Sequence, residues 1–361
     1  MNLDELRSQL TAVDEQLIAL IAERQRIVGD ISREKLSSGR ATRDFEREKI
    51  VLSGARDRAM HHGVDPDLAE DILSALIRAS LTNQERERVA AQGVGSGRRA
   101  LVIGGAGKMG RWFSDFFASQ GFVTTVADTS LSKGYNHYTD WREAGVDFDV
   151  IVVATPLAVS ATVLEELAER KPRGLIFDIG SLKTPLRSSL QRLAAAGCRV
   201  TSLHPMYGPD TRLLSGRHLI FVDVGVPEAT AAAKELFAVT MVEELDMNVD
   251  DHDRLIAYVL GLSHALNIAF FTALAESGEA APRLAQLSST TFDAQLLVSG
   301  AVAHDNPRLY FEIQSLNDYG LDPLDALCSS AERIRKIVAD GDEQAFVELM
   351  ENGRQYLAAR R

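Results

Sequence analysis

Cysteines are few in this sequence, and long hydrophobic runs are absent. Among its 361 residues only Cys198 and Cys328 are cysteines, far apart and outside any CxxC pair. Their number and spacing argue against a disulfide framework or a thiolate zinc site, and we expect no bound metal. No apolar run reaches roughly 18 residues, and the start MNLDELRSQL lacks the basic and apolar regions of a signal peptide. We therefore expect a cytoplasmic protein with no membrane partner.

Basic residues are also in the minority. The chain has 39 lysines and arginines against 51 aspartates and glutamates, a formal net charge of −12 at pH 7. This balance disfavours nucleic acid as a partner. The length is sufficient for two or three domains. Any anionic substrate must therefore be bound by local clusters of cationic side chains.

The first 90 residues are predicted to form an all-α domain of three helices. Apolar side chains from Leu3 to Ile31 recur every three or four residues, which is the spacing of a packed helix. Asp65 followed by Pro66 is a typical helix start. The linker AAQGVGSGRR, rich in glycine, ends the domain. We predict the helices over residues 3–35, 44–60 and 66–88.

One cationic residue interrupts the apolar stripe of the first helix. Arg24 stands between Leu20 and Ile27, where the pattern requires an apolar side chain. Burying an arginine is costly unless an anion binds it, so we expect a negatively charged ligand. Lys35 projects from nearly the same face, about 20° from Arg24 around the helix. The second and third helices direct further polar side chains inward at helical spacing: Asp44, Arg47, Glu48, Ser80 and Gln84.

A second arginine of the first helix lies too far away to share that ligand. Arg7 is roughly 25 Å along the axis from Arg24 and about 100° around it. An antiparallel second subunit would bring Arg7 to the ligand, so we predict a homodimer. The alternative is that these charges form surface ion pairs and that Arg24 sets the register of a coiled coil.

Taken together, these residues resemble the active-site pattern of the all-helical chorismate mutases, over residues 3–88. The resemblance implies rearrangement of chorismate to prephenate without metal or cofactor. Arg7, Arg24 and Arg47 would bind the substrate carboxylates. Lys35 and Gln84 would donate to the ether oxygen, where negative charge grows, and Asp44 and Glu48 would bind the ring hydroxyl.

From Ala100 onwards, short apolar strands alternate with helices. The segments ALVIGG, VTTVAD, DVIVVATP, GLIFDIG, RVTSLHP and HLIFVDV predict a mostly parallel, doubly wound sheet. After Asp250 the pattern is helical to the end, with stretches too apolar for exposed helices. The overall prediction is a multidomain chain: a helical domain over 1–90, an α/β Rossmann-type domain over 98–250 and an all-α dimerisation domain over 251–361.

The first strand leads into a glycine-rich turn. Gly105, Gly107 and Gly110 stand in G-x-G-x-x-G register before a helix, and Asp128 ends the next strand. This arrangement predicts dinucleotide binding, with the acid on the ribose hydroxyls. Asp128 would repel a 2′-phosphate, which favours NAD, although Lys133 leaves NADP open. Other expected cofactor contacts are Lys108 and Met109 in the turn, and Thr155 and Pro156 after the third strand.

Two more motifs follow strand ends, where ligands bind in such sheets. DIGSLK contains Asp178, Ser181 and Lys183, and His204 opens HPMYGPD. A histidine before proline can also be a capped loop residue. Beside the cofactor turn, however, these strings resemble the D-x-x-S-x-K and H-P-M-[FY]-G-P motifs of the prephenate dehydrogenase family, over about residues 100–350. With the first domain, the whole resembles the bifunctional chorismate mutase–prephenate dehydrogenase type.

The resemblance assigns a role to each of these side chains. His204 would accept the proton of the ring hydroxyl as hydride leaves for NAD, and loss of CO2 would give 4-hydroxyphenylpyruvate. Ser181 would bind the same hydroxyl or orient the imidazole. Lys183, Tyr207 and His264 would contact the substrate, although a buried structural role is equally open for His264.

One position departs from the family pattern. In LVSGAVAHDNPRLY the family has an arginine after the glycine, for the ring carboxylate, and this chain has Ala301. Such a loss forfeits about 1.5–3 kcal/mol of binding unless another cation substitutes, for example Arg217, Arg254 or Arg308. Two alternatives stay open: the same reactions on 4-amino-4-deoxychorismate and its prephenate analogue, and a noncatalytic NAD-binding regulator. The helical tail does not resemble an ACT regulatory domain.

Overall fold

The computed structural model describes residues 2–359. The chain forms two compact units, each built from several segments. The first unit comprises Met1–Thr155, Thr162–Ile179 and Leu190–Asp246. The second comprises Pro156–Ala161, Gly180–Ser189 and Met247–Arg361.

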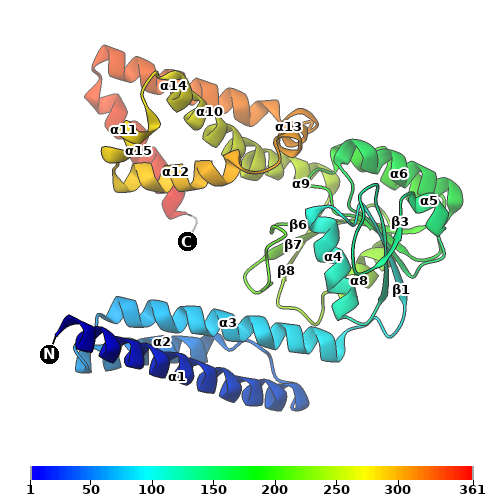
Figure 1. Cartoon of the computed structure of the whole chain (residues 1–361). Coiled ribbons are helices and arrows are strands. Elements are labelled where there is room, and N and C mark those ends of the chain that lie inside the picture. The colour runs from blue at the N-terminus through cyan, green and yellow to red at the C-terminus, as the bar shows by residue number, and fades with distance from the viewer. Residues whose placement is uncertain (1, 360–361) are drawn as a thin grey trace. The chain divides into compact units, whose positions relative to one another are not determined.

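Three helices form the N-terminal part of the first unit, as predicted (Figure 1). They are α1 (Leu3–Ser37), α2 (Phe45–His61) and α3 (Pro66–Gln92). Side chains cap all three: Asn2 caps α1 in a capping box with Glu5, and Asp44 and Asp65 cap α2 and α3. Helix α3 runs past its predicted end at residue 88, because the first residues of the linker continue the helix.

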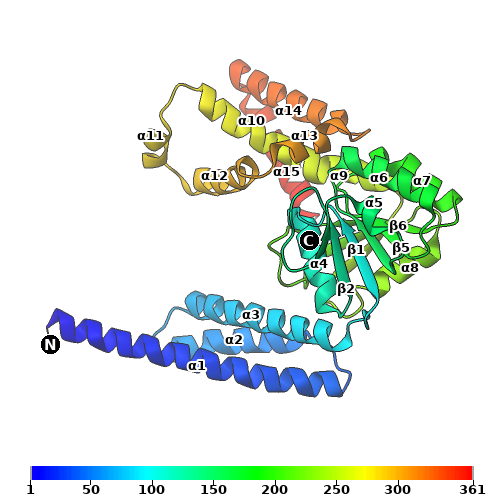
Figure 2. The same cartoon turned by 45° about the vertical axis from the view of Figure 1, so that its right-hand side comes forward.

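The apolar stripe of α1 is exposed. No residue of α1 is buried, contrary to the packing that the spacing of its apolar residues predicts within one chain. The N-terminal part of α1 extends beyond α2 and α3 (Figure 2). The side chains of the stripe are 45–61% exposed: Leu3, Leu6, Leu10, Val13, Leu17, Leu20, Ile27 and Ile31. A helix with such a face requires a second surface to cover it.

An eight-stranded sheet forms the rest of the first unit, in the order β3-β2-β1-β4-β5-β6-β7-β8. In this order the six strands from β3 through β2, β1, β4 and β5 to β6 are parallel, and β7 runs antiparallel to β6. The six predicted strands are present, which confirms the Rossmann-type fold. The bounds are β1 (Arg99–Ile103), β2 (Val123–Ala127), β3 (Asn136–Tyr138), β4 (Val150–Val153), β5 (Leu175–Asp178), β6 (Arg199–Pro205), β7 (His218–Val222) and β8 (Glu243–Met247).

Helices connect the strands, and apolar side chains fill the centre of the sheet. Leu101, Ile151 and Phe177 are fully buried on adjacent strands. Phe113 and Phe117 of α4 pack in the same core. The connecting helices are α4 (Lys108–Ser119), α5 (Trp141–Ala144), α6 (Leu157–Arg170), the short 3-10 helix η1 (Thr184–Leu186), α7 (Arg187–Ala195) and α8 (Pro227–Glu235).

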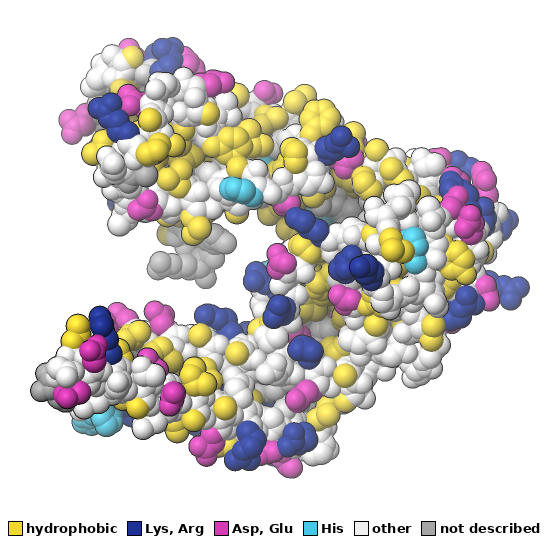
Figure 3. Space-filling view, viewed as in Figure 1, with side chains coloured by type: hydrophobic (Ala, Val, Ile, Leu, Met, Phe, Trp, Pro, Cys, Tyr) yellow, Lys and Arg dark blue, Asp and Glu magenta, His cyan; other side chains and the backbone are white. Residues whose placement is uncertain are grey.

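The C-terminal part of the second unit is helical as far as Ala358, as predicted. Its elements are α9 (Val249–Ile256), the π-helix η2 (Ala257–Leu262), α10 (Ser263–Glu276), α11 (Ala281–Gln286), α12 (Thr290–Ala303), α13 (Pro307–Ser315), α14 (Leu321–Asp340) and α15 (Glu343–Ala358). Hydrophobic side chains are exposed on these helices (Figure 3), among them Leu266, Leu297 and Phe311. The segment Val249–Glu276 is long and apolar enough to cross a membrane, which by itself is a weak indication.

Candidate active sites

A cavity of about 130 Å³ lies between α1, α2 and α3. Apolar walls come from Val28, Val51, Ile77 and Leu81. Seven of the residues predicted for the first reaction line it: Arg24, Lys35, Asp44, Arg47, Glu48, Ser80 and Gln84. The three helices thus bring cations, carboxylates and an amide to one small space.

Arg24 is held by neutral groups of α3. Its Nη1 donates to Ser80 Oγ at 2.9 Å and to the Leu76 carbonyl at 3.3 Å. Within residues 2–359 the guanidinium forms no ion pair. Burial lowers the pKa of Arg24, although a guanidinium stays charged at neutral pH. The positive charge is therefore oriented and left for an anionic ligand.

Two further groups in the cavity point to a polar ligand. Lys35 Nζ donates to the Thr42 carbonyl at 2.8 Å, which holds its ammonium at the cavity edge. Gln84 is only 8% exposed, and its buried Oε1 has no hydrogen-bond partner in the described part of the chain. Buried polar atoms are rarely left unsatisfied in native structures, so a ligand group is expected to complete this one.

The two carboxylates of the cavity are held in different ways. Asp44 Oδ1 accepts the Arg47 backbone N–H at 2.9 Å and so caps α2. Both oxygens of Glu48 accept from the Arg43 guanidinium, at 3.0 and 2.9 Å. Arg43 Nη1 also donates to Ser215 Oγ at 2.7 Å, in the loop between β6 and β7. Sequence reasoning missed Arg43, whose five-residue distance from Glu48 is not a helical spacing.

Arg7 does not line this cavity. Its side chain is 70% exposed and lies 3.5 Å from Asp4 one turn away on α1. The spacing of Arg7 and Arg24 along α1 predicts that Arg7 lies away from this cavity within a single chain.

The glycine-rich turn between β1 and α4 packs too closely for side chains. A Cβ on Gly110 would lie 2.1 Å from the Gly104 carbonyl oxygen, and one on Gly105 would lie 2.6 Å from Val126 Cγ1. Gly107 is the N-cap of α4 and has no side chain to cap the first turn of the helix. Lys108 and Met109 form the first turn of α4. This is the geometry that accommodates a pyrophosphate.

Asp128 directly follows β2 and is tied to the same turn. Its Oδ2 accepts the Ala106 N–H at 3.0 Å, and its Oδ1 accepts the Ser130 N–H at 2.8 Å. Thr155 and Pro156 follow the end of β4, the neighbour of β1. The residues present therefore fit an adenine dinucleotide, with a carboxylate placed for ribose hydroxyls.

His204 lies near the end of β6, opposite Ile220 of β7, and is 4% exposed. Tyr207 follows in the next loop, with its ring 5.2 Å from that of Trp112. The Tyr207 hydroxyl is buried and has no partner among the described residues. Burial raises the pKa of Tyr207, and the nearby charge of Glu85 adds to this rise.

In the second unit, a buried carboxylate fixes the segment that carries Ser181 and Lys183. Asp253 accepts the Lys183 N–H at 2.9 and 3.0 Å and the Thr184 N–H at 2.7 Å, and His252 Nδ1 lies 2.6 Å away. Lys183 is fully buried and Ser181 is half-buried. Burial alone would raise the pKa of Asp253, but hydrogen bonds from His252 and Thr184 outweigh it and lower the pKa. Sequence reasoning missed this pair; the only signal was that His252 and Asp253 share a helix face with Ile256.

His264 stands in the first turn of α10, directly after the π-helix η2. Its ring lies 4.1 Å from that of Tyr310, and its buried Nδ1 has no partner in the described range. Burial lowers the pKa of His264 to about 4, so the ring is neutral at pH 7. π-Helical turns are frequent at functional sites.

Ala301 is exposed on α12. The cations considered as substitutes for the missing arginine, Arg217, Arg254 and Arg308, are also exposed, and Arg254 pairs with Asp251.

Three family models match consecutive parts of the chain. Chorismate mutase type II matches residues 6–85, the nucleotide-binding domain of prephenate dehydrogenase matches 123–239, and its dimerization domain matches 248–352. Together they follow the order of parts that the sequence predicts.

Individual proteins agree with these matches. The chain is 28% identical to the T-protein of Enterobacter agglomerans over 349 residues, which cover 96% of this chain and 90% of the relative. It is 30% identical to the 4-amino-4-deoxyprephenate dehydrogenase of Streptomyces pristinaespiralis, over 70% of this chain and 88% of that protein. Among solved structures, prephenate dehydrogenase from A. aeolicus with hydroxyphenyl propionate and NAD+ has a TM-score of 0.58 at 16% identity, covering 73% of this chain and 98% of that one, which is a likeness of fold.

Proposed function

Because this chain belongs to the family that joins a type II chorismate mutase to a prephenate dehydrogenase, we propose that it performs both reactions in tyrosine biosynthesis. It rearranges chorismate to prephenate and oxidises prephenate, with loss of CO2, to 4-hydroxyphenylpyruvate. The observation that carries the proposal is the cavity that gathers Arg24, Lys35, Glu48 and Gln84 in the same chain as a dinucleotide turn. We assign the mutase reaction to residues 1–90, NAD binding to residues 98–250, and substrate binding and dimerisation to residues 251–361.

The first reaction needs a compact substrate conformation and stabilisation of negative charge on an ether oxygen. Arg24 supports the proposal because its charge is oriented by Ser80 and has no carboxylate partner in the described chain. Arg24 and Arg47 bind the substrate carboxylates. Lys35 and Gln84 donate to the ether oxygen, and Asp44 and Glu48 bind the ring hydroxyl. Every contribution is electrostatic, so the step requires no titration of a protein group.

The second reaction combines hydride removal with loss of a carboxylate. NAD supplies the hydride acceptor when it is bound at the glycine turn, and Asp128 discriminates against a 2′-phosphate. His204 accepts the proton of the ring hydroxyl, and Ser181 orients the hydroxyl or the imidazole. Lys183, Tyr207 and His264 contribute to substrate binding. Aromatisation of the ring makes the step effectively irreversible.

We further propose that the protein is a cytoplasmic homodimer. The exposed apolar stripe of α1 requires a cover, and the C-terminal helices match a dimerization domain and are rich in exposed apolar side chains. An antiparallel partner along α1 brings its Arg7 to the cavity that holds Arg24. Burial in a subunit interface also accounts for the apolar character of Val249–Glu276 without a membrane.

A second candidate function uses 4-amino-4-deoxychorismate and its prephenate analogue. Ala301, in place of the family's arginine, favours it, and so does the 30% identity to a 4-amino-4-deoxyprephenate dehydrogenase. We rank it second because that relative matches 70% of this chain, whereas the T-protein matches 96%.

The deciding experiment is incubation of the full chain with chorismate and NAD+, followed by identification of the products. We expect chorismate to disappear, NADH to form and 4-hydroxyphenylpyruvate to accumulate. Parallel reactions with 4-amino-4-deoxychorismate compare the two substrate classes by their rates of NADH formation. Persistence of both substrates would leave a noncatalytic NAD-binding protein.

A further inference from the structure

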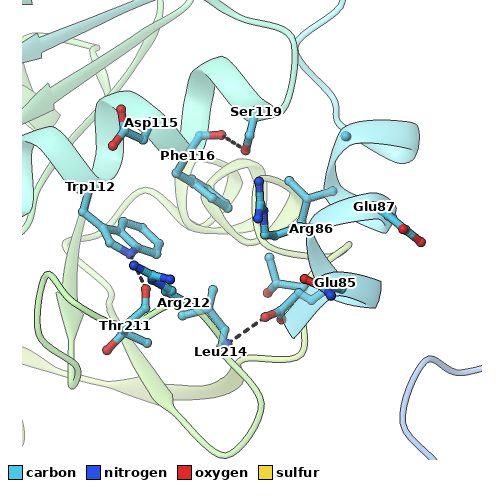
Figure 4. Close-up of a pocket in the computed structure, with 14 residues that line it drawn as sticks. Glu85, Arg86, Glu87, Trp112, Asp115, Phe116, Ser119, Thr211, Arg212 and Leu214 are labelled. Carbon is cyan, nitrogen blue, oxygen red and sulfur yellow. Dashed lines mark hydrogen bonds between the residues drawn. The ribbon is translucent and has the colours of Figure 1, made fainter. Parts of the chain in front are cut away.

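A larger cavity lies on the other side of α3, within the first unit. Its volume is about 670 Å³, which is in the usual range for small-molecule sites. Its walls come from the last turns of α3, the outer face of α4, the loop after β6 and Thr240 (Figure 4). None of the residues predicted for either reaction is among its described lining residues. Neither proposed reaction is therefore assigned to this cavity.

Two arginines reach this cavity without a partner. Arg86 projects from α3 and Arg212 from the loop after β6, so that they approach from opposite sides (Figure 4). Neither has an ion pair or a side-chain hydrogen bond to any residue within 2–359. In a chain with a net charge of −12, two unpaired arginines at one cavity form a local site for an anion.

The acidic groups of the lining form no ion pair with these arginines within the described residues. Both Glu85 oxygens are occupied, by the N–H groups of Leu214 and Met241 at 2.7 Å each. Asp115 accepts from the hydroxyl of Tyr135. Glu87 is exposed and points away from the cavity (Figure 4). These three carboxylates therefore leave both guanidinium groups without an ion-pair partner in the described chain, and the two cations stay available to an anion.

An aromatic surface lies beside the two cations. The rings of Trp112 and Phe116 are stacked, with centroids 5.1 Å apart and planes inclined by 19°. Trp112 Nε1 donates to the Thr211 carbonyl at 2.9 Å, which fixes the indole at the wall. A flat apolar surface next to two guanidinium groups suits a ligand that has an aromatic ring and a carboxylate.

We propose that this cavity binds a small aromatic carboxylic acid, with its ring on Trp112 and Phe116 and its carboxylate between Arg86 and Arg212. The ligand contacts both α3, which carries Gln84, and α4, which begins at the dinucleotide turn.

Intrinsic fluorescence tests the proposal, because the chain has only two tryptophans, Trp112 and Trp141. In the full-length Trp141→Phe variant all indole emission comes from Trp112. Titration with 3-phenylpropionate is expected to change this emission saturably. With Arg86→Ala and Arg212→Ala added, the dissociation constant is expected to rise at least tenfold.

The matched control is Arg78→Ala, which removes the same charge from an exposed position of α3 outside the cavity lining. We expect it to leave the titration unchanged. Because Arg86 and Arg212 are exposed, their substitution does not threaten folding. No saturable change in emission, or equal affinity with and without the two arginines, overturns the proposal.

Discussion

The Arg43 guanidinium donates to both carboxylate oxygens of Glu48, at 3.0 and 2.9 Å. Its remaining terminal nitrogen donates to Ser215 at 2.7 Å, in the loop that follows His204 and Pro205 along the chain. One side chain thus joins a carboxylate of the mutase cavity to the dehydrogenase part of the first unit. We regard Arg43 as a positioning residue for Glu48.

Arg43→Lys should lower mutase kcat/KM by roughly tenfold, because lysine cannot form the planar bidentate pair. Steady-state chorismate consumption measures the effect. Separate kcat and KM values show whether Glu48 is misplaced in the enzyme–substrate complex. Ser215→Ala should have a smaller effect, since the pair with Glu48 remains. Arg58→Ala, on the exposed side of α2, is the control. Equal rates for Arg43→Lys and the unaltered chain would remove the positioning role.

The two reactions should respond to different substitutions. Arg24→Ala should lower mutase activity by roughly 100- to 1,000-fold and leave oxidation of supplied prephenate intact. His204→Asn should lower NADH formation by roughly 100- to 10,000-fold and spare the mutase. Chorismate consumption and prephenate-dependent NADH formation are measured on each variant. If either substitution abolished both activities in a folded protein, the proposed separation of sites would be wrong.

Complementation between subunits tests the role of Arg7. Arg7→Ala and Arg24→Ala homodimers should both be nearly inactive as mutases. When the two variants are co-refolded in equal amounts, half of the dimers are mixed, and each mixed dimer contains one intact site. Mutase activity should therefore recover to about a quarter of the normal value. Failure to recover, with mixed dimers demonstrated by mass spectrometry of tagged chains, would show that Arg7 acts within its own chain or not at all.

Glu85→Ala should destabilise the first unit. Glu85 is 4% exposed, and its loss leaves the Leu214 and Met241 N–H groups without their acceptor. The expected cost is roughly 2 kcal/mol or more of unfolding free energy, seen as a lower midpoint in urea. Glu87→Ala, an exposed position on the same helix, should change the midpoint little. Equal midpoints for the two variants would contradict this account.

The pH dependence of stability should report on His264. Burial lowers the pKa of this histidine to about 4 from 6.5, with only partial opposition from Asp305. The unfolded chain therefore binds a proton that the folded chain does not, so this stability is complete above pH 6.5 and is lost as the pH falls toward 4. His264→Phe should reduce the slope of unfolding free energy against pH in this window. The exposed His61→Phe should not, and a slope unaffected by His264→Phe would place that histidine in water.

Local patterns in the sequence predicted the three N-terminal helices, six strands and the glycine turn, because each depends on spacing or caps within a few residues. Strands β3 and β8 escaped, since β3 is very short and EELDM in β8 has no apolar alternation. The roles of Arg43 and Asp253 could not be predicted, because Ser215 reaches Arg43, and the amides of Lys183 and Thr184 reach Asp253, only in the folded chain. The stripe of α1 predicted a helix correctly, but the packing that it also predicted is absent within a single chain, where no residue of α1 is buried.

The carboxylate of Glu85 has a consequence for dividing this polypeptide. A fragment that starts at Arg99 would retain every strand of the sheet yet would expose the amides of Leu214 and Met241, which α3 now serves. Separate expression of residues 1–98 and of the remaining chain would therefore require new hydrogen-bond acceptors for these two amides. For this reason, separating the N-terminal helices from the sheet is expected to destabilise the sheet-containing part.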